Sequence, residues 1–187
     1  MEVLGAVVRL QVQRSRLKPG PRASRVYDPA PLLEVAALEV GPRGVTGDGH
    51  LDVHHADHAD SRNRGVNGLS LLPRAHYARL RARFGDHLVD GVAGESLRLD
   101  TGGAWVLDDL HGDLALETTD GGLLAVTDPL VAAPCVEFTR FCLRRPPGPD
   151  DDELAAALEE LDGGTRGFYV TVAGEGRVEA GSRLLRR

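Results

Sequence analysis

The apolar positions of this chain fall mostly into short runs at strand-like spacing. Loosely alternating apolar residues predict a strand over Val3–Val12 and a second over Leu33–Val40. Between them, Lys18–Pro31 is rich in Pro, Arg and Gly and is expected to be a loop. Further along, short apolar runs broken by Gly, Asp and Pro are typical of several short strands in a sheet or barrel. These runs are Glu95–Leu99, Trp105–Leu107, Leu114–Glu117 and Leu123–Thr127.

One segment in the first half of the chain has the spacing of a helix. Its apolar stripe places side chains four residues apart, at Leu72, His76, Leu80 and Phe84. We expect Ser70 to cap this helix, Pro73 to lie in its first turn and Gly85 to end it. His76 lies on the apolar stripe, so we expect a hydrogen-bonded histidine in the core.

The second half of the chain predicts two more helices and a closing pair of strands. Asp151–Leu161 has apolar residues at helical spacing and acidic residues at its start, which suit the positive end of the helix dipole. A shorter helix is expected over Cys135–Leu143. The last strands, Gly167–Val172 and Arg177–Leu185, are expected to form a hairpin around Ala173–Gly176.

Composition places the chain among globular proteins with a single domain over residues 1–187. It is 42% hydrophobic and 27% charged, and its elements predict an α+β fold, mostly β, with two or three helices. A net charge of −6 argues against a broad nucleic-acid or anionic-membrane surface. The chain has no apolar run long enough to span a membrane and no signal-like start. Two cysteines are too few for a disulfide framework, so we expect a reducing cytoplasm.

Cys135 is the first candidate for chemistry. It follows Pro134, and at the start of a helix the unpaired N–H groups favour a thiolate. A nucleophile, a sulfur carrier or a soft-metal ligand needs such a thiolate. The alternative is a buried and inert cysteine. Cys142 lies seven residues on, about 10 Å along a helix, which is too far for a disulfide. It is expected to lie in the core beside Phe138 and Phe141.

The segment Gly41–Gly68 is the second candidate, because it has almost no apolar periodicity. It holds four histidines within nine residues, and His and carboxylate side chains are good ligands for divalent metals. The sequence HExxH is absent, because Leu51 follows His50. Two readings therefore stay open: a divalent-metal site, or a polar loop that faces a cofactor or solvent. The residues concerned are His50, His54, His55 and His58, with the aspartates between them.

A third candidate precedes the first helix. Arg62, Arg64 and Asn67, with glycines between them, could bind a phosphate near a helix start. The alternative is a solvated turn. No Walker A or GxGxxG pattern is present, so a nucleotide is not predicted. Glu95 follows a glycine and is expected to have a structural or supporting role.

The order of four motifs resembles the MOSC family, named for the C-terminal domain of molybdenum cofactor sulfurase. The resemblance covers about Val3 to Leu185. Each motif is short, and their order and spacing carry the match. They are Gly44–His50, similar to a Gly-x-x-Gly-Asp segment with a nearby His; Gly94–Leu97, similar to Gly-Glu-Asn-Leu; Pro134-Cys135; and Gly167–Tyr169 with the later Gly181-Ser182.

The resemblance implies a MOSC-type β-barrel with two or three helices packed around it. It also implies that the protein binds the molybdenum cofactor (molybdopterin), with Cys135 binding molybdenum or carrying sulfur. Polar loop residues would hold the pterin and its phosphate, namely Asp48, His50, Arg62, Arg64 and Asn67. The chain departs from the family pattern at Gly49, where Arg is usual, at Ser96 in place of Asn and at Ser182 in place of Asp.

Four functions stay open on this evidence. The first is a molybdenum cofactor-dependent oxidoreductase, and the second is a sulfur carrier or sulfurtransferase in which Cys135 holds a persulfide. The third is a divalent metal-binding protein or metal-dependent hydrolase that uses His50, His54 and His58. The fourth is a MOSC-like binding domain that has lost the cofactor. We expect a small-molecule cofactor and substrate, with a cysteine desulfurase or redox partner, and neither nucleic acid nor membrane.

Overall fold

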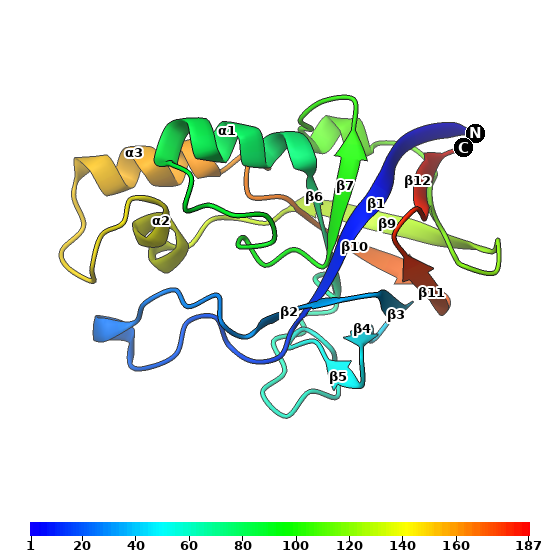
Figure 1. The fold of residues 1–187 in the computed structure, drawn as a ribbon, viewed down its shortest axis with the longest axis horizontal. Helices are drawn as coiled ribbons and strands as arrows, with labels where there is room; N and C mark the ends of the chain where they lie inside the picture. The colour runs from blue at the N-terminus through cyan, green and yellow to red at the C-terminus, as the bar shows by residue number, and fades with distance from the viewer.

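Seven strands close into a β-barrel in the computed structural model, which describes all residues, Met1–Arg187 (Figure 1). The barrel closes because β1 pairs with both β12 and β7. All neighbouring pairs are antiparallel except β6 and β7, which are parallel. In order around the barrel, the strands are β1 (Glu2–Gln13), β12 (Arg183–Arg186), β8 (Leu114–Glu117), β9 (Leu123–Val131), β10 (Phe168–Ala173), β6 (Leu69–Pro73) and β7 (Leu97–Thr101).

The strand β1 is long enough to serve three neighbours in turn. Its first residues pair with β12, its middle with β7 and its last four with β2 (Leu32–Val35). Gly5 lies where β12 and β7 both meet β1, and a Cβ atom there would come within 2.7 Å of Thr101. Glycine is therefore required for the close approach of strands at this point.

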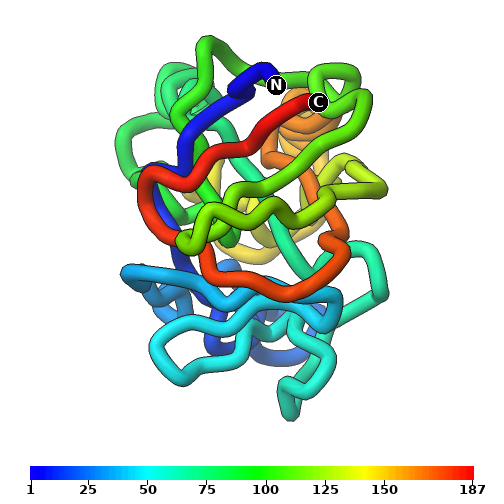
Figure 2. Tube along the Cα trace, turned by 90° about the vertical axis from the view of Figure 1, so that its right-hand side faces the viewer, coloured from blue at the N-terminus to red at the C-terminus, as the bar shows by residue number.

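A second, four-stranded sheet lies against one end of the barrel, below it in Figures 1 and 2. Its order is β11 (Gly176–Glu179), β3 (Ala37–Gly41), β4 (Gly44–Gly47) and β5 (His50–Leu51). The strand predicted over Leu33–Val40 is therefore two strands, β2 and β3, which belong to different sheets.

The predicted hairpin at the end of the chain is wrong. β10 pairs with β9 and β6 in the barrel, whereas β11 pairs with β3 in the second sheet. Gly174, with φ of 89°, lies in the connection that carries the chain from one sheet to the other. Sequence spacing alone does not show that the two strands part at this turn.

Three helices gather on one side of the barrel (Figure 1). They are α1 (Arg74–Phe84), α2 (Val136–Cys142) and α3 (Asp152–Leu161). Their apolar sides pack with residues of β6 and of neighbouring loops in a second core of 11 buried residues, beside the barrel core of 21. Cys142 lies in this second core beside Phe138 and Phe141, as predicted, and burial raises the pKa of its thiol to about 12.

All three predicted helices are present, but the predicted start of α1 is wrong. The side chain of Asp151 caps α3 by accepting a hydrogen bond from the Leu154 amide, and Gly85 ends α1. However, Ser70 does not cap α1, because Leu69–Pro73 forms the barrel strand β6 and the helix begins at Arg74. The run of apolar residues there is as compatible with a buried strand as with a helix.

Two further predictions concern the surroundings of α1. His76 is buried, as expected: its Nε2 accepts from the Trp105 amide at 2.9 Å, so its Nδ1 donates to the Thr165 carbonyl at 3.0 Å. Burial lowers the pKa of this imidazole. The strand predicted over Trp105–Leu107 is wrong, because this stretch leads into a short 3₁₀ helix, Leu107–Leu110. No helix in the fold has the length and apolar character needed to cross a lipid bilayer.

Candidate functional site

A cavity of about 550 Å³ opens between the barrel and the segments that surround it, and we call it the Cys135 cavity. Its walls come from six parts of the chain: the end of β1 and the loop after it, the segment after β5, the strand β6, the loop before β7, the end of β9 with its connection to α2, and the start of β10 with the residues just before it. The volume lies within the usual range of small-molecule sites.

Cys135 lies on the wall of this cavity, at the residue before α2. Its backbone is extended, and its carbonyl accepts hydrogen bonds from the amide and hydroxyl of Thr139 at 2.9 and 3.0 Å. These bonds fix where the helix starts and thus where the sulfur lies. The side chain is half-buried and unbridged, so the alternative of a sealed cysteine does not describe this position.

Arg166 lies beside Cys135 and was missed by the sequence analysis. It donates to the carbonyls of Ala93 and Ala133 at 3.3 and 3.4 Å, and its guanidinium lies 5.1 Å from the ring centre of Phe138. Its Nε atom is sealed from solvent and has no hydrogen-bond partner. No spacing or motif marks this residue, because it is one arginine among many in the sequence.

Two buried tyrosine hydroxyl groups hold residues of the cavity and its surroundings in place. Tyr27 donates to the Val92 carbonyl at 2.6 Å, and burial raises the pKa of its phenol. Tyr77 donates to the carboxylate of Glu95, with distances of 2.8 and 3.0 Å to its two oxygens. Burial raises the pKa of Glu95 to about 7, so this carboxyl can hold or release a proton near neutral pH.

The lining of the Cys135 cavity is strongly cationic, although the chain as a whole carries a net charge of −6. Glu95 is the one carboxylate among the lining residues. Three of the cations have carboxylates nearby: Arg16 pairs with Asp60, and two others lie 4.0 Å from Glu137. The remaining three have no acidic partner. The six lining cations are Arg16, Lys18, Arg25, Arg62, Arg64 and Arg166.

Three residues that the sequence analysis proposed for phosphate binding do line the cavity. Asn67 is buried and holds the loop in shape: its side chain accepts from the Arg64 amide at 2.7 Å and donates to the Arg62 carbonyl at 3.0 Å. The guanidinium of Arg64 lies 5.9 Å from the ring centre of Tyr169, on the opposite wall. Asn67 thus shapes the loop that presents both arginines.

Two other proposed cofactor ligands, Asp48 and His50, do not line the cavity. Asp48 and Gly49 form the two-residue turn between β4 and β5, with φ of 49° and 79°. Positive φ at both positions is the signature of a tight hairpin turn, for which Asp-Gly is a preferred sequence. Both Asp48 and His50 are exposed there. The Gly-Asp motif therefore makes a turn in this chain.

The histidines of the same segment are not brought together. No group of three His, Cys, Asp or Glu side chains in the structure could hold a metal ion, which includes the set His50, His54, His58 and Cys135. Tight turns send the rings to separate surroundings: His58 bonds the Arg14 carbonyl at 3.0 Å, and His55 accepts from the Asp57 amide at 3.1 Å. The geometry thus does not support the divalent-metal hydrolase alternative.

His54 differs from its neighbours because it lines the Cys135 cavity. Its Nδ1 lies 3.0 Å from a carboxylate oxygen of the buried Asp52, which also accepts from the Gln13 amide at 2.7 Å. The carboxylate places the ring proton on Nδ1, and the ring's Nε2 has no protein partner. Asp52 therefore orients His54 and attaches this segment to β1.

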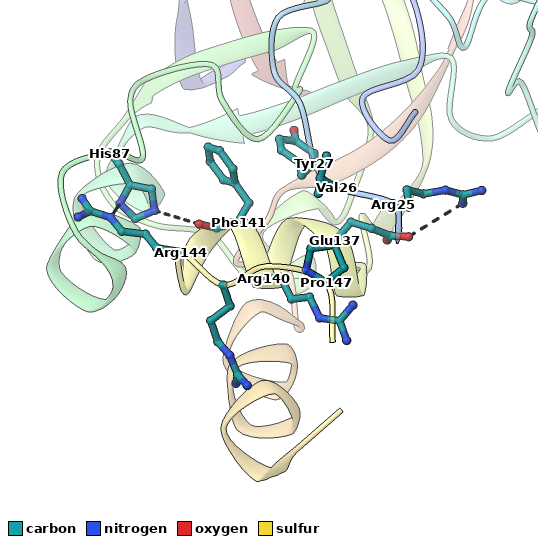
Figure 3. A pocket seen from close by; sticks show the side chains of 10 residues that line it. Arg25, Val26, Tyr27, His87, Glu137, Arg140, Phe141, Arg144 and Pro147 are labelled. Atoms are coloured by element: carbon teal, nitrogen blue, oxygen red, sulfur yellow. Dashed lines mark hydrogen bonds and ion pairs between the residues drawn. The ribbon is translucent and has the colours of Figure 1, made fainter. Parts of the chain in front are cut away.

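A second cavity, of about 360 Å³, lies on the other side of Tyr27 and is shown in Figure 3. We call it the Arg144 cavity. His87 accepts from Arg144 Nε at 3.1 Å, so its other nitrogen donates to the Phe141 carbonyl. The other arginines here are matched by acids, as when Arg140 pairs with Asp150 at 2.9 Å. Arg144 is the one arginine here without an acidic partner, whereas the Cys135 cavity has three such arginines.

Comparison with known proteins identifies the fold. No family model and no curated protein sequence matches the chain. Among solved structures, the YuaD protein from Bacillus subtilis is similar at 15% identity with a TM-score of 0.60, over 96% of this chain and 93% of that one. The chain shares the fold of YuaD, a closed barrel of seven strands with three helices. It also resembles YiiM from Geobacillus stearothermophilus, at 22% identity and a TM-score of 0.54, over 97% and 74% of the two chains.

YiiM from Escherichia coli is a third similar structure, at 20% identity and a TM-score of 0.51. The match covers 83% of this chain and 65% of that chain. These likenesses confirm the predicted class, a mostly β barrel with helices packed around it. At such identities they establish the fold alone, so any function must be argued from the residues of the site.

Proposed function

We propose that the Cys135 cavity binds an anionic cofactor, the molybdenum cofactor, with the sulfur of Cys135 as a ligand to the metal. One observation carries this proposal: a half-buried free thiol lies on the wall of a cavity that is lined by six cations and one carboxylate. The shared fold with YuaD and YiiM and the motif order of the sequence support the same ligand class.

The residues present fit such a group. The cofactor is a pterin with a phosphate, and Arg62 and Arg64, which have no acidic partner, offer donors for a phosphate. A thiolate is a soft ligand that suits a soft or high-valent metal centre. Cys135 would hold the metal, and the aromatic ring of Tyr169 offers a face for the planar pterin.

The protein's own groups supply binding, orientation and proton control. When bound, the cofactor would supply the redox chemistry, which is general for such groups. Glu95 is positioned by Tyr77 and titrates near neutral pH, so it can exchange a proton with a ligand in the cavity. His54 is oriented by Asp52, and its Nε2 is free to accept a hydrogen bond from a ligand.

The test is metal content after expression in a host that makes the cofactor. We expect molybdenum in the purified wild-type protein and its loss in Cys135→Ala, measured by mass spectrometry of the metal. Cys142→Ala is the matched control, because Cys142 lies in the helical core away from the cavity lining. Equal molybdenum in both variants, or none above background in the wild type, would contradict the proposal.

The same accessible thiol supports a second candidate, sulfur transfer. In that reaction the Cys135 thiolate attacks the outer sulfur of a donor persulfide, and the donor leaves as a thiolate, so that Cys135 becomes a persulfide. Incubation with a cysteine desulfurase and free cysteine should then add the mass of one sulfur atom to the wild-type protein and not to Cys135→Ala. An unchanged intact mass would remove this candidate.

A further inference from the structure

Arg166 is unusual among the poorly exposed arginines of this protein because it has no carboxylate partner. The side chains of Arg98 and Arg140 are only 12% and 15% exposed, and each forms an ion pair, with Asp90 and Asp150 respectively. No ion pair involves Arg166, although its Nε is sealed from solvent. An uncompensated cation at such a position is costly unless something else supplies the negative charge.

The protein groups around Arg166 satisfy it only in part. Its two carbonyl contacts, at 3.3 and 3.4 Å, are at the long end of the hydrogen-bond range. They hold the guanidinium between the loop before β7 and the connection before α2, against the ring of Phe138. The thiol of Cys135 and the phenols of Tyr27 and Tyr169 line the same cavity as Arg166 and interact with its charge.

We propose that Arg166 binds an oxyanion of the reacting ligand and holds it against the sulfur of Cys135. The ligand class is a small molecule with a carboxylate, sulfonate or phosphate oxygen next to the atom that meets the sulfur. The planar guanidinium is suited to this task, since its N–H groups can bind two oxygens of one anion. The inference rests on the proposed function only in placing the reacting ligand in the same cavity.

A purely structural role makes a different prediction. If Arg166 only braces the Ala93 and Ala133 carbonyls and stacks on Phe138, its removal should affect stability and leave the charge preference at Cys135 unchanged. The two roles are therefore separated by the ratio of the rates at which an anionic and a neutral reagent react with Cys135. Both rates are measured on the same protein, so the ratio does not depend on how much of the thiol is ionised.

The experiment compares iodoacetate with iodoacetamide on the full-length protein. Both alkylate a thiolate and release iodide, and they differ in one carboxylate. Peptide mass spectrometry would give the rate constant at Cys135 for each reagent. We expect the iodoacetate-to-iodoacetamide ratio to fall by about tenfold in Arg166→Gln, the size expected for loss of one charge-assisted hydrogen bond. An equal ratio in both proteins would overturn the proposal.

Two further variants control for charge and for folding. Arg140→Gln removes a poorly exposed, paired arginine on α2 and should leave the ratio unchanged. Arg166→Lys keeps the charge without the planar fork and should give an intermediate ratio. If Arg166→Gln does not fold, protection of the wild-type protein decides: sulfate should slow iodoacetamide at Cys135 in wild type and less in Arg166→Lys, and absence of protection in wild type would overturn the proposal.

This test is independent of the metal assay. It needs no molybdenum, so a charge-selective Cys135 in a protein that binds no molybdenum would overturn the proposed function and leave the role of Arg166 in place. A protein that binds molybdenum but shows no charge selectivity at Cys135 would support the proposed function and overturn the role of Arg166.

Discussion

The two arginine-lined cavities on either side of Tyr27 look alike in composition and differ in charge compensation. They share Arg25 and Tyr27 in their walls. In the Arg144 cavity, acidic residues of the connection to α3 and of its first turn neutralise Arg140 and Arg145. In the Cys135 cavity, Arg62, Arg64 and Arg166 have no carboxylate partner. The comparison teaches that the number of arginines without an acidic partner, rather than the total number of arginines, distinguishes the proposed anion site.

The largest expected effect comes from the buried aromatic side chain that packs against both Arg166 and Tyr27. Phe138 is fully buried, lies beneath Arg166, and its ring centre is 5.0 Å from that of Tyr27. We expect Phe138→Ala to lower the free energy of unfolding by about 3–5 kcal/mol, as for other large core truncations. Urea denaturation measures this. A loss below about 1 kcal/mol would show that the core around Phe138 is not tightly packed.

The second effect is pH dependence from the carboxylate of the Cys135 cavity. Burial raises the pKa of Glu95 from 4.5 to about 7, so between these values the folded state binds more protons than the unfolded state. The stability contribution is therefore lost as pH rises from about 4.5 to about 7. Glu95→Gln removes this dependence. Between pH 5 and pH 8, the free energy of unfolding of the variant should therefore rise by about 1–3 kcal/mol relative to that of the wild type. An identical pH profile for the two proteins would contradict the assignment.

Anion affinity tests the comparison directly. With inorganic pyrophosphate as the probe, Arg64→Gln should weaken binding by about tenfold, since one charge-assisted contact is lost. Arg145→Gln is the matched control: Arg145 lines the Arg144 cavity and pairs with Asp151 and Glu153, so its loss should leave the affinity unchanged. Isothermal titration calorimetry gives both values. Equal losses in the two variants would mean that the cavities do not differ in the way described.

The smallest effect is expected for a compensated arginine. Arg140 pairs with Asp150, whose side chain is 76% exposed, and such ion pairs contribute little. Arg140→Gln should change the free energy of unfolding by no more than about 1 kcal/mol. A larger loss of stability would show that the Arg140–Asp150 ion pair contributes more to folding than its exposed position indicates.

Elements with a local signal could be predicted from the sequence. Leu114–Glu117 is the strand β8 with the predicted bounds, and Asp151 caps α3, because apolar spacing and a capping carboxylate act over a few residues. Pairing between strands could not be predicted in the same way. The separation of β10 from β11 depends on contacts with β9 and β3, which lie far away in the sequence.

The site shows the same division. Cys135, Arg62 and Arg64 come from segments whose composition stood out, and the structure places all three on one cavity. Arg166 has no such signal, because it is distinguished only by the lack of a carboxylate partner in the folded structure, and this cannot be seen in the sequence. Asp48 was misassigned because the Gly-Asp-Gly sequence that fits the family motif also encodes a tight turn, and the turn is what forms here.

Closure of the barrel through β1 and β12 has a consequence for how the protein is made. The pairing joins residues 2–6 to residues 183–186, so β1 has no partner on that side until almost the whole barrel sequence has left the ribosome. Contacts of such long range slow folding, because a long loop must be closed before they form. The emerging chain thus exposes this edge of β1 until β12 has been synthesised, and the pairing of β12 with β1 then closes the barrel.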